Sequence, residues 1–377
     1  MSTTTKHDRR TDARRIAPLH DYRSGRELLL GLGEQAGARF DHHRHPLAGP
    51  DGAPIYTDVA RFGADPGDAH TVVFIASGTH GVEGHAGWGL QRLLLAGGRL
   101  DDLPAGVAVV LIHAVNPYGM AWSRRVDHEN VDVNRNFVDF AEPLPANPGY
   151  DDIDAILNPS GPSFDLGDDT WRADLLAYVD EVGALRAFRT ISGGQYDRPH
   201  GMQFGGGGPT WSRRTLHDIW TSHVGSARRA FHLDIHTGLG PCGGLTVFQT
   251  ADAEEVAAEV AARWFPVWRV DRTVDREPLQ VGLLSPAFDA AMPADVLSVP
   301  IVVEFGTHAD AVVLAAMRAD NWLHQHGDPA SALGEDIRAA TRDAFFLEDE
   351  SWREKVAEQG MAVIDAALDT AAERIDA

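Results

Sequence analysis

Residues 71–96 read TVVFIASGTHGVEGHAGWGLQRLLLA, which places a strand, a loop and a helix in immediate succession. Thr71–Ser77 is a short apolar run rich in β-branched residues, and such a run predicts a buried strand. Gly84–Ala96 carries leucines at 90, 93 and 94 and is predicted to be a helix. Loops that leave the carboxyl ends of parallel strands are where α/β proteins place their sites. The loop SGTHGVEG between the two elements is therefore the first place to look for chemistry.

The same alternation continues on both sides of this stretch. Strands are predicted at Val107–His113, Phe231–His236, Leu245–Gln249 and Leu297–Phe305, and helices at Tyr22–Ala36, Ala253–Trp264, Asp310–His326 and Trp352–Ile375. Strands that alternate with helices indicate an α/β fold. We expect a mostly parallel or mixed twisted central sheet with helices covering both faces.

The chain divides into an arm and one large domain. Residues 1–20 are polar and are predicted to form a flexible N-terminal arm. Residues 21–377 are predicted to form a single catalytic α/β domain with a loop-rich excursion at about 140–209. The excursion is rich in Asp, Pro and Gly, with one helix predicted near Trp171–Phe188. It either walls an active site or is a surface insertion without function, and the sequence leaves both open.

The composition excludes several classes of function. Lys plus Arg total 33 against 55 Asp plus Glu, so the formal net charge is −22. A surface this acidic repels nucleic acid and anionic membranes, and we expect neither as a partner. No apolar run approaches the ~20 residues of a membrane span, and the N-terminal residues lack the apolar stretch of a secretory signal, so we expect a cytoplasmic protein. Cys242 is the only cysteine, so histidines and carboxylates must hold any metal.

His80 and Glu83 form the first candidate group for metal binding. They are three residues apart, so both side chains share a face if a helix begins here. Imidazole nitrogen and carboxylate oxygen are ordinary zinc ligands. The alternative is a surface histidine beside a glutamate that the helix dipole favours.

Two short motifs place arginines in an otherwise acidic chain. Arg124 and Arg125 follow the strand Val107–His113, and the motif NVDVNRNF contains Asn134 and Arg135. An arginine can bind a carboxylate through two parallel hydrogen bonds, and a neighbouring asparagine can add more. The alternative is structural, with Arg135 paired to Asp132 or Asp139 and Asn134 capping a turn.

Two later strands end in titratable side chains. In FHLDIHTG the alternation puts His232, Asp234 and His236 on one face, and His236 stands at the strand end as a possible third ligand. Asp234 could orient a ligating histidine. Glu304 ends the apolar strand IVVEFG, where burial should raise its pKa toward the range of a general base. The alternatives are a satisfied core histidine and a glutamate paired with a buried arginine.

In this order, the motifs SGTHGVEG, NPYG, NVDVNRNF, DIHTGLG and VEFGTH resemble the zinc carboxypeptidase (M14-like) superfamily. That superfamily also includes deacylases related to aspartoacylase and succinylglutamate desuccinylase. The sequence is most similar to an uncharacterised bacterial M14-like metallopeptidase branch (DUF2817-like). The resemblance extends from about Asp21 to the region of Trp322.

The resemblance implies a role for each of nine residues. It implies that one Zn²⁺ per chain is bound by His80, Glu83 and His236. It implies that Glu304 is the general base and that Arg125, or Arg124 beside it, stabilises the oxyanion. Asn134 and Arg135 would hold the substrate carboxylate. The family's tyrosine is missing, because residues 250–303 contain no Tyr, and Tyr196 could fill part of its role.

The implied activity is hydrolysis of an amide bond next to a free carboxylate, in a peptide or an N-acyl amino acid. Removal of a C-terminal residue and deacylation of N-acyl amino acids both need these roles, so the sequence leaves the choice open. A further alternative is a non-catalytic carboxylate-binding protein on the same fold. The expected partner is a small-molecule or peptide substrate with a free carboxylate, and the chain could form a homo-oligomer.

Overall fold

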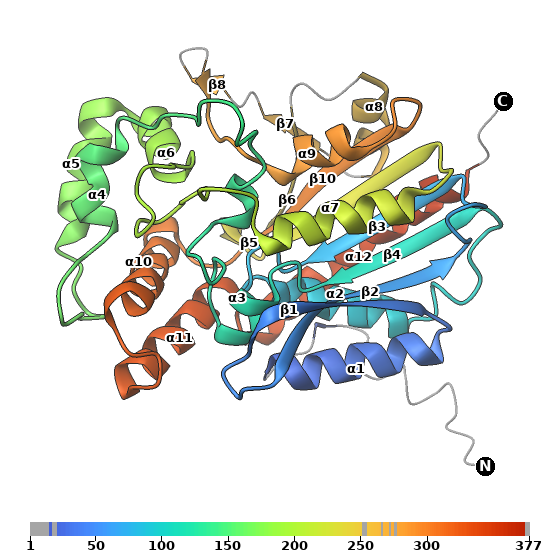
Figure 1. Ribbon diagram of the computed structural model, residues 1–377, viewed down its shortest axis with the longest axis horizontal. Helices are drawn as coiled ribbons and strands as arrows, with labels where there is room; N and C mark the ends of the chain where they lie inside the picture. The colour runs from blue at the N-terminus through green and yellow to red at the C-terminus, as the bar shows by residue number, and fades with distance from the viewer. Residues whose placement is uncertain are drawn as a thin grey trace.

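The computed structural model describes residues 15–16, 21–250, 255–264, 267–270, 273–274 and 277–373 (Figure 1). An eight-stranded sheet forms its centre, in the order β1-β2-β4-β3-β5-β10-β6-β7. Its strands are β1 Arg39–Ala48, β2 Pro54–Gly63, β3 Thr71–Ser77, β4 Val107–His113, β5 Arg229–Cys242, β6 Leu245–Thr250, β7 Val267–Val270 and β10 Leu297–Gly306. A separate pair is formed by β8 Thr273–Val274 and β9 Glu277–Pro278.

The sheet is mixed, which confirms the predicted fold class. Strands β4, β3, β5 and β10 run parallel to one another, as do β6 and β7. Strands β1, β2 and β4 pair antiparallel in turn, and β6 pairs antiparallel with β10. The parallel centre reads as uninterrupted apolar runs because it is buried on both faces.

Helices cover both faces of the sheet. The helices of the described residues are α1 Tyr22–Gln35, α2 Gly84–Ala96, α3 Pro117–Trp122, η1 Val133–Arg135, α4 Tyr150–Leu157, α5 Trp171–Val182, α6 Ala184–Ser192, α7 Trp211–Val224, α8 Glu255–Trp264, α9 Leu284–Ala291, α10 Asp310–His326, α11 Ala332–Phe345 and α12 Glu350–Ala372. Figure 1 shows α7 on the near face of the sheet and α12 behind it.

Strand β3 shows how the sheet separates two cores. Val73 and Ile75 pack in the core formed with α1, α2, α8 and α12. Val72 and Phe74 pack in the core formed with α7 and α9. Successive side chains of a strand point to opposite faces, so a run of apolar residues serves both cores.

The hairpin of β1 and β2 was not predicted. Strand β1 reads RFDHHRHPLA, and most of its side chains are exposed at the edge of the sheet. A polar edge strand gives no apolar run from which to recognise it. His45 is the exception in β1, since only 2% of its surface is exposed.

The predicted excursion contains three described helices, α4, α5 and α6, rather than one. The prediction of one helix near Trp171–Phe188 is wrong, because Gly183 interrupts the helix. Gly183 has φ 85° and ψ 149°, a conformation that glycine adopts far more readily than other residues. The helix α4 was missed, although Tyr150, Ile153 and Leu157 form a small core there.

The structure describes only part of the predicted elements at the two ends of the chain. Most of the predicted arm lies outside the described residues, but Ile16 is fully buried and its amide donates to the carbonyl of Arg353. Ile375, the predicted end of the last helix, also lies outside them. None of the helices in the described residues is long and apolar enough to cross a membrane.

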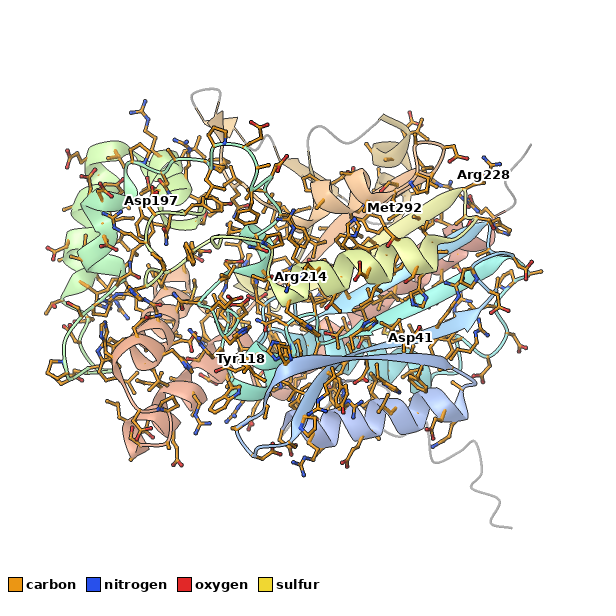
Figure 2. The ribbon with its side chains drawn as sticks, in the orientation of Figure 1. Asp41, Tyr118, Asp197, Arg214, Arg228 and Met292 are labelled. Atoms are coloured by element: carbon orange, nitrogen blue, oxygen red, sulfur yellow. The ribbon has the colours of Figure 1, made fainter. Side chains whose placement is uncertain are left out.

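The carboxyl ends of the central strands meet on one side of the sheet. Figure 2 labels Arg228, before β5, and Met292, before β10, at the amino ends of these strands. Tyr118, after β4, and Asp197, in the excursion, lie toward the opposite side. The predicted site residues are all on the side of Tyr118.

Candidate metal centre

The loop after β3 is held against the loop that contains the two predicted arginines. The amide of Gly81 donates to the carbonyl of Arg125, and the amide of Val82 donates to that of Arg124. Gly81 allows this approach, because a Cβ there would lie 2.1 Å from the carbonyl carbon of Gly119. Two backbone hydrogen bonds therefore hold the two loops against each other.

Glu83 lies between the other two predicted metal ligands, His80 and His236. One oxygen of its carboxylate lies 2.8 Å from Nδ1 of His80, and the other lies 2.9 Å from Nδ1 of His236. All three side chains are buried. The structure thus brings together residues that lie 153 positions apart in the chain.

The far nitrogen of each histidine is held by an aspartate. Nε2 of His80 lies 3.0 Å from Oδ1 of Asp132, and Nε2 of His236 lies 2.8 Å from Oδ2 of Asp234. Thr79 donates its hydroxyl to the other oxygen of Asp234 at 2.7 Å. A carboxylate on the outer nitrogen favours a proton there, so Nδ1 is the nitrogen that faces the centre with a lone pair whenever the imidazole is neutral.

This arrangement fits a metal ion. Although Nδ1 of His80 is close to Glu83, it has no partner with hydrogen-bond geometry among the described residues. Two imidazole nitrogens and one carboxylate are a ligand set of catalytic zinc sites, which keep a further position open. The ligand atoms all lie within 4.8 Å of one another, close enough to share one ion.

The charges around Glu83 favour its ionised form. Burial opposes ionisation, but the positive charges of His80 and His236 hold the pKa of Glu83 far below its usual range. Burial likewise opposes protonation of His236, but the charge of Asp234 and hydrogen bonds raise its pKa well above the usual value. The centre is therefore built to hold positive charge between carboxylates.

Glu304 lies beside this group at the end of β10. It is the register partner of His236 in the parallel pair of β5 and β10, so both side chains point to the same face. Its carboxylate accepts a hydrogen bond of 3.0 Å from the amide of Leu239. Burial, and then the negative charge of Glu83, raise the pKa of Glu304 to about 8.

The structure separates the two adjacent arginines. Nη2 of Arg125 lies 2.9 Å from Nε2 of His80, and Nη1 donates to Asp132 at 2.5 Å. Arg124 instead donates to the carbonyl of Asp127 and to the side chain of Asn130. Arg125 therefore faces the candidate centre, whereas Arg124 ties its own loop together.

Asn134 and Arg135 lie next to the centre, but some of their polar atoms already have hydrogen-bond partners in the protein. Oδ1 of Asn134 accepts from the amide of Leu284 at 2.8 Å. Arg135 is buried, and it donates through Nε to the carbonyl of Ser192 and through Nη1 to that of Asn134. Its Nη2 has no hydrogen-bond partner among the described residues, so this nitrogen remains for a ligand.

Tyr196 is brought to the same place from the excursion. Its hydroxyl donates to the carbonyl of Arg135 at 2.6 Å, and burial raises its pKa far above the usual value. This contact positions Arg135, and a direct contact of Tyr196 with substrate stays a prediction. Together with Ser192, it places the end of the excursion against the site as a wall.

Asp132 is the residue whose importance the sequence did not reveal. Besides holding His80 and Arg125, its Oδ1 accepts from the amide of Asn134 at 2.9 Å. The sequence offered it only as a partner for Arg135, and no such ion pair is present among the described contacts. Its position two residues before Asn134 in NVDVNR was the available signal, since aspartates often accept from the amide two residues on.

A family model described as "Protein of unknown function (DUF2817)" matches residues 19–359, which is most of the chain. The chain belongs to the DUF2817 family. The predicted likeness to this branch is thereby confirmed. A search of curated proteins gives no match to this DUF2817 protein.

Solved structures that match the chain include three kinds of protein. Carboxypeptidase A from Helicoverpa armigera is 13% identical with a TM-score of 0.45, over 91% of this chain and 77% of that one. A candidate metallopeptidase from Shewanella amazonensis is 14% identical with a TM-score of 0.37, over 80% and 92%. A candidate succinylglutamate desuccinylase/aspartoacylase family protein from the same organism is 16% identical with a TM-score of 0.32, over 76% and 71%. At these identities and TM-scores the likeness does not give the reaction of the DUF2817 protein.

Proposed function

We propose that this DUF2817 protein is a zinc-dependent hydrolase that cleaves an amide bond next to a free carboxylate. The observation that carries the proposal is the shared carboxylate of Glu83, which lies 2.8 and 2.9 Å from Nδ1 of His80 and His236. Two aspartates orient the histidines, and a buried glutamate with a raised pKa stands one strand away. Few structural roles call for so many titratable groups in one buried place.

Glu304 is proposed as the general base. When bound by His80, Glu83 and His236, zinc supplies a Lewis acid that lowers the pKa of water toward ~7 and polarises a carbonyl. Glu304 accepts a proton from the attacking water and returns it to the leaving amine. Its raised pKa suits both directions of transfer, because a catalytic pKa near the working pH is the most effective.

Arg125 and the Asn134–Arg135 pair are proposed to bind the substrate at two points. Arg125 keeps its charge, since Asp132 and Glu83 raise its pKa despite burial. Its guanidinium is proposed to stabilise the negative charge that develops on the carbonyl oxygen. Nη2 of Arg135 and the side-chain amide of Asn134 are proposed to hold the free carboxylate, which fixes the scissile bond in place.

Removal of a C-terminal residue and deacylation of an N-acyl amino acid both fit this arrangement. Glu304 distinguishes a hydrolase from a non-catalytic carboxylate-binding protein, because a protein that only binds carboxylates does not need a base with a raised pKa. Replacing Glu304 with Gln should leave metal binding intact and lower the rate of hydrolysis by about 10²–10⁴-fold. The expected cytoplasmic location and any homo-oligomer stay predictions.

The first test is the metal content of the purified protein and its His236→Ala variant. We expect about one zinc per wild-type chain and loss of that zinc in the variant, since a three-ligand site loses one ligand. Cobalt or manganese could take the place of zinc at such a site. Wild-type protein that takes up no divalent metal from an added excess would exclude the proposal. Hydrolysis of N-acetyl amino acids and dipeptides by the metal-loaded protein is measured next.

A further inference from the structure

The last part of strand β5 leaves its pairing with β10 directly after the candidate centre. Phe305 of β10 pairs with Thr237, but the next residue of β10, Gly306, pairs with Cys242. Residues 238–241 therefore bulge out of the ladder between the two strands. A bulge redirects the backbone groups of a strand, which are then free to bind partners other than the neighbouring strand.

Two backbone amides at this bulge donate to carboxylates of the site. The amide of Thr237 donates to Oε2 of Glu83 at 3.3 Å, and the amide of Leu239 donates to Oε1 of Glu304 at 3.0 Å. The first carboxylate belongs to a proposed metal ligand and the second to the proposed base. We call residues 237–239 the donor segment. The sheet fixes the spacing of the strands, whereas the direction of each carboxylate depends on the rotatable bonds of its side chain, which these amides restrain.

The hydroxyl of Thr237 ties the donor segment to the helix α11. It donates to the carbonyl of Phe345, the last residue of α11, at 2.7 Å. The last carbonyls of a helix have no partner within the helix, so a side chain or water must satisfy them. Thr237 is buried, with 2% of its surface exposed, so its hydroxyl performs this role in place of water.

The ring of Phe345 packs against the middle of the donor segment. A Cβ at Gly238 would lie 2.9 Å from Cε1 of this ring, so only glycine allows the contact as it stands. Gly238 also has φ 124°, a conformation that other residues rarely adopt. The ring belongs to the same small core as Val82, the residue before Glu83. The end of α11 thus contacts the donor segment through both a carbonyl and a ring.

Thr307 makes the same bond to the same helix end without reaching the carboxylates. Its hydroxyl donates to the carbonyl of Ala344 at 2.7 Å, and 1% of its surface is exposed. Among the described residues, no hydrogen bond joins Thr307 to Glu83 or Glu304. The two threonines therefore match in burial and bond length and differ in what their backbone holds.

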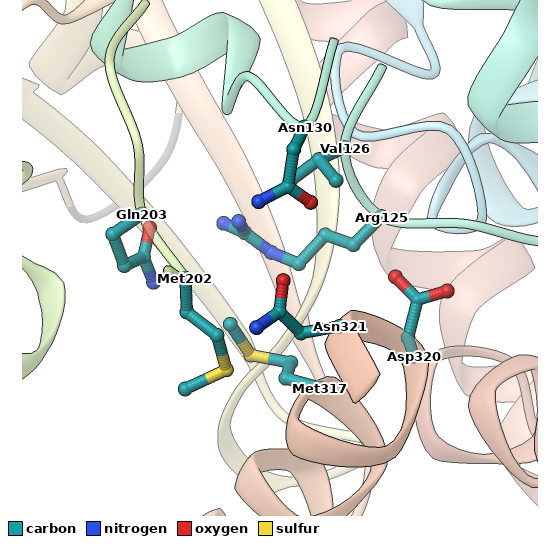
Figure 3. A pocket seen from close by; sticks show the side chains of 8 residues that line it. All are labelled: Arg125, Val126, Asn130, Met202, Gln203, Met317, Asp320 and Asn321. Carbon is teal, nitrogen blue, oxygen red and sulfur yellow. The ribbon is translucent and has the colours of Figure 1, made fainter. Parts of the chain in front are cut away.

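The proposed oxyanion-binding residue, Arg125, is held by other parts of the chain. Figure 3 shows the side chains beside it, which come from the stretches 126–130, 202–203 and 317–321. Its guanidinium also pairs with Asp132. A change at Thr237 should therefore act on the two carboxylates and leave Arg125 in place.

Resting on the proposed function, we infer that Thr237 is a positioning residue of the hydrolase. Its hydroxyl holds the donor segment on α11, so that the two amides keep the carboxylates of Glu83 and Glu304 in one orientation. Misplacing a reacting group by about 1 Å can lower a rate by about 100-fold, so the loss of this hydroxyl should lower kcat. Substrate binding is assigned to Asn134 and Arg135, so KM should change little.

Amide hydrogen exchange of the metal-free protein tests the inference without metal or turnover. Thr237→Val keeps the shape of the side chain and removes the hydroxyl. We expect exchange of the Leu239 amide, measured by NMR, to become at least about tenfold faster, the factor that corresponds to one typical hydrogen bond. Thr307→Val should lower the urea midpoint to a similar extent and leave this exchange within about twofold of wild type. Equal exchange of the Leu239 amide in the two variants would overturn the inference.

Steady-state hydrolysis of an N-acetyl amino acid or dipeptide by the zinc-loaded proteins tests the catalytic consequence. Thr237→Val should lower kcat about 10–100-fold with KM within about threefold, and Thr307→Val should stay within about twofold of wild type. Thr237→Ser retains a hydroxyl and should restore kcat to within about threefold. If Thr237→Val does not fold, Thr237→Ala removes the hydroxyl with less crowding and replaces it in both experiments. Equal kcat values for the Thr237 and Thr307 variants would contradict the inference.

The inference and the proposed function can fail separately. Wild-type protein that binds no zinc and hydrolyses none of these compounds would remove the hydrolase, and the exchange of the Leu239 amide would still decide whether Thr237 holds the donor segment. Hydrolysis by wild-type protein, with unchanged exchange and kcat in Thr237→Val, would keep the hydrolase and remove the role of Thr237.

Discussion

Among single residues, Asp132 connects three groups of the site. One of its oxygens contacts His80 and the amide of Asn134, and the other accepts from Arg125. Arg125 and His80 keep its carboxylate ionised despite burial, with a pKa well below the usual value. An asparagine has the same shape but lacks the charge and one acceptor, so it cannot satisfy all three groups.

Asp132→Asn should therefore weaken zinc binding by about 10–100-fold, the usual effect of losing the outer partner of a ligating histidine. The affinity is measured by competition with a zinc indicator. Asp139→Asn, on the exposed side of the neighbouring turn, should leave the affinity unchanged. Equal affinities for Asp132→Asn and wild type would show that Asp132 does not orient His80.

Glu304 carries an energetic cost in the metal-free protein. Its pKa is about 8 in the folded state, against an ordinary value of 4.5. Between these values the folded state binds more protons than the unfolded state, so this group lowers the free energy of unfolding as pH rises. Below about pH 4.5 Glu304 is protonated in both states and does not change the free energy of unfolding. Above about pH 8 its destabilising effect is complete.

At pH 9, Glu304→Gln should therefore raise the Tm of the metal-free protein. The free energy of unfolding should rise by up to a few kcal/mol, because one pKa unit corresponds to about 1.4 kcal/mol. The gain should shrink as the pH is lowered toward 5. Thermal unfolding in the presence of a chelator measures both. Glu348→Gln, at an exposed position, is the control, and a gain that did not change with pH would contradict the assigned cause.

The site residues show what sequence can supply at this scale. His80, Glu83, His236 and Glu304 were predicted because each ends a strand or follows one in an otherwise apolar setting. Adjacent arginines could not be separated in the same way, because the sequence does not say which side chain turns toward the centre. The role of Asp132 depends on contacts with residues 52 and 7 positions away, which no local pattern contains.

At the scale of elements, the loop between β3 and α2 depends on the absence of a side chain at Gly81. An alanine there would place Cβ 2.1 Å from the backbone of Gly119, and backbone cannot move aside as a flexible side chain can. Overpacking of this kind typically costs about 1–3 kcal/mol. Because His80 is the preceding residue, the shift should also displace this proposed metal ligand.

Gly81→Ala is expected to lower the free energy of unfolding and the zinc content together. Gly31→Ala offers a contrast, because Gly31 lies inside α1 and a Cβ there would meet nothing within 4 Å. That change should stabilise the protein by about 0.5–1 kcal/mol, since alanine favours helix over glycine. Urea denaturation of both variants checks the pair, and a stable, zinc-bound Gly81→Ala protein would refute the argument.

The elements also show where sequence reasoning succeeds. Predicted bounds for β3, β4, α2 and α10 agree with the structure to the residue, because these elements are apolar runs or periodic helices with clear ends. The hairpin of β1 and β2 and the helix α4 had no such signal. Gly183 was visible in the sequence, but its effect on a helix predicted near Trp171–Phe188 depends on a positive φ that only the structure supplies.

At the scale of the whole molecule, several buried histidines favour neutral conditions. Burial lowers the pKa of His232 and His113 to about 4 and that of His85 to about 3. His232 lies among Trp220 and Phe288, and neither ring nitrogen has a hydrogen-bond partner among the described residues. Such a histidine is neutral in the fold and takes up a proton on unfolding below its ordinary pKa of 6.5.

Above pH 6.5 these neutral histidines do not lower the free energy of unfolding. They lower it progressively as the pH falls toward 4. His232→Met keeps an apolar group of similar size and cannot be protonated, so its free energy of unfolding should decline less between pH 7 and pH 5. Comparing the two proteins cancels the effect of the net charge of −22, which changes similarly in both. Parallel declines, measured by urea denaturation at each pH, would exclude a contribution from His232.

The pairing of Glu304 with His236 across two parallel strands has a consequence for how the protein can change. Neighbouring strands lie about 4.8 Å apart, and backbone hydrogen bonds maintain that spacing. The distance between a proposed base and a proposed metal ligand is thus a property of the sheet rather than of any loop. The excursion, by contrast, reaches the site from outside the sheet, where Ser192 and Tyr196 contact Arg135. An engineer could therefore exchange that segment without changing the spacing between Glu304 and His236.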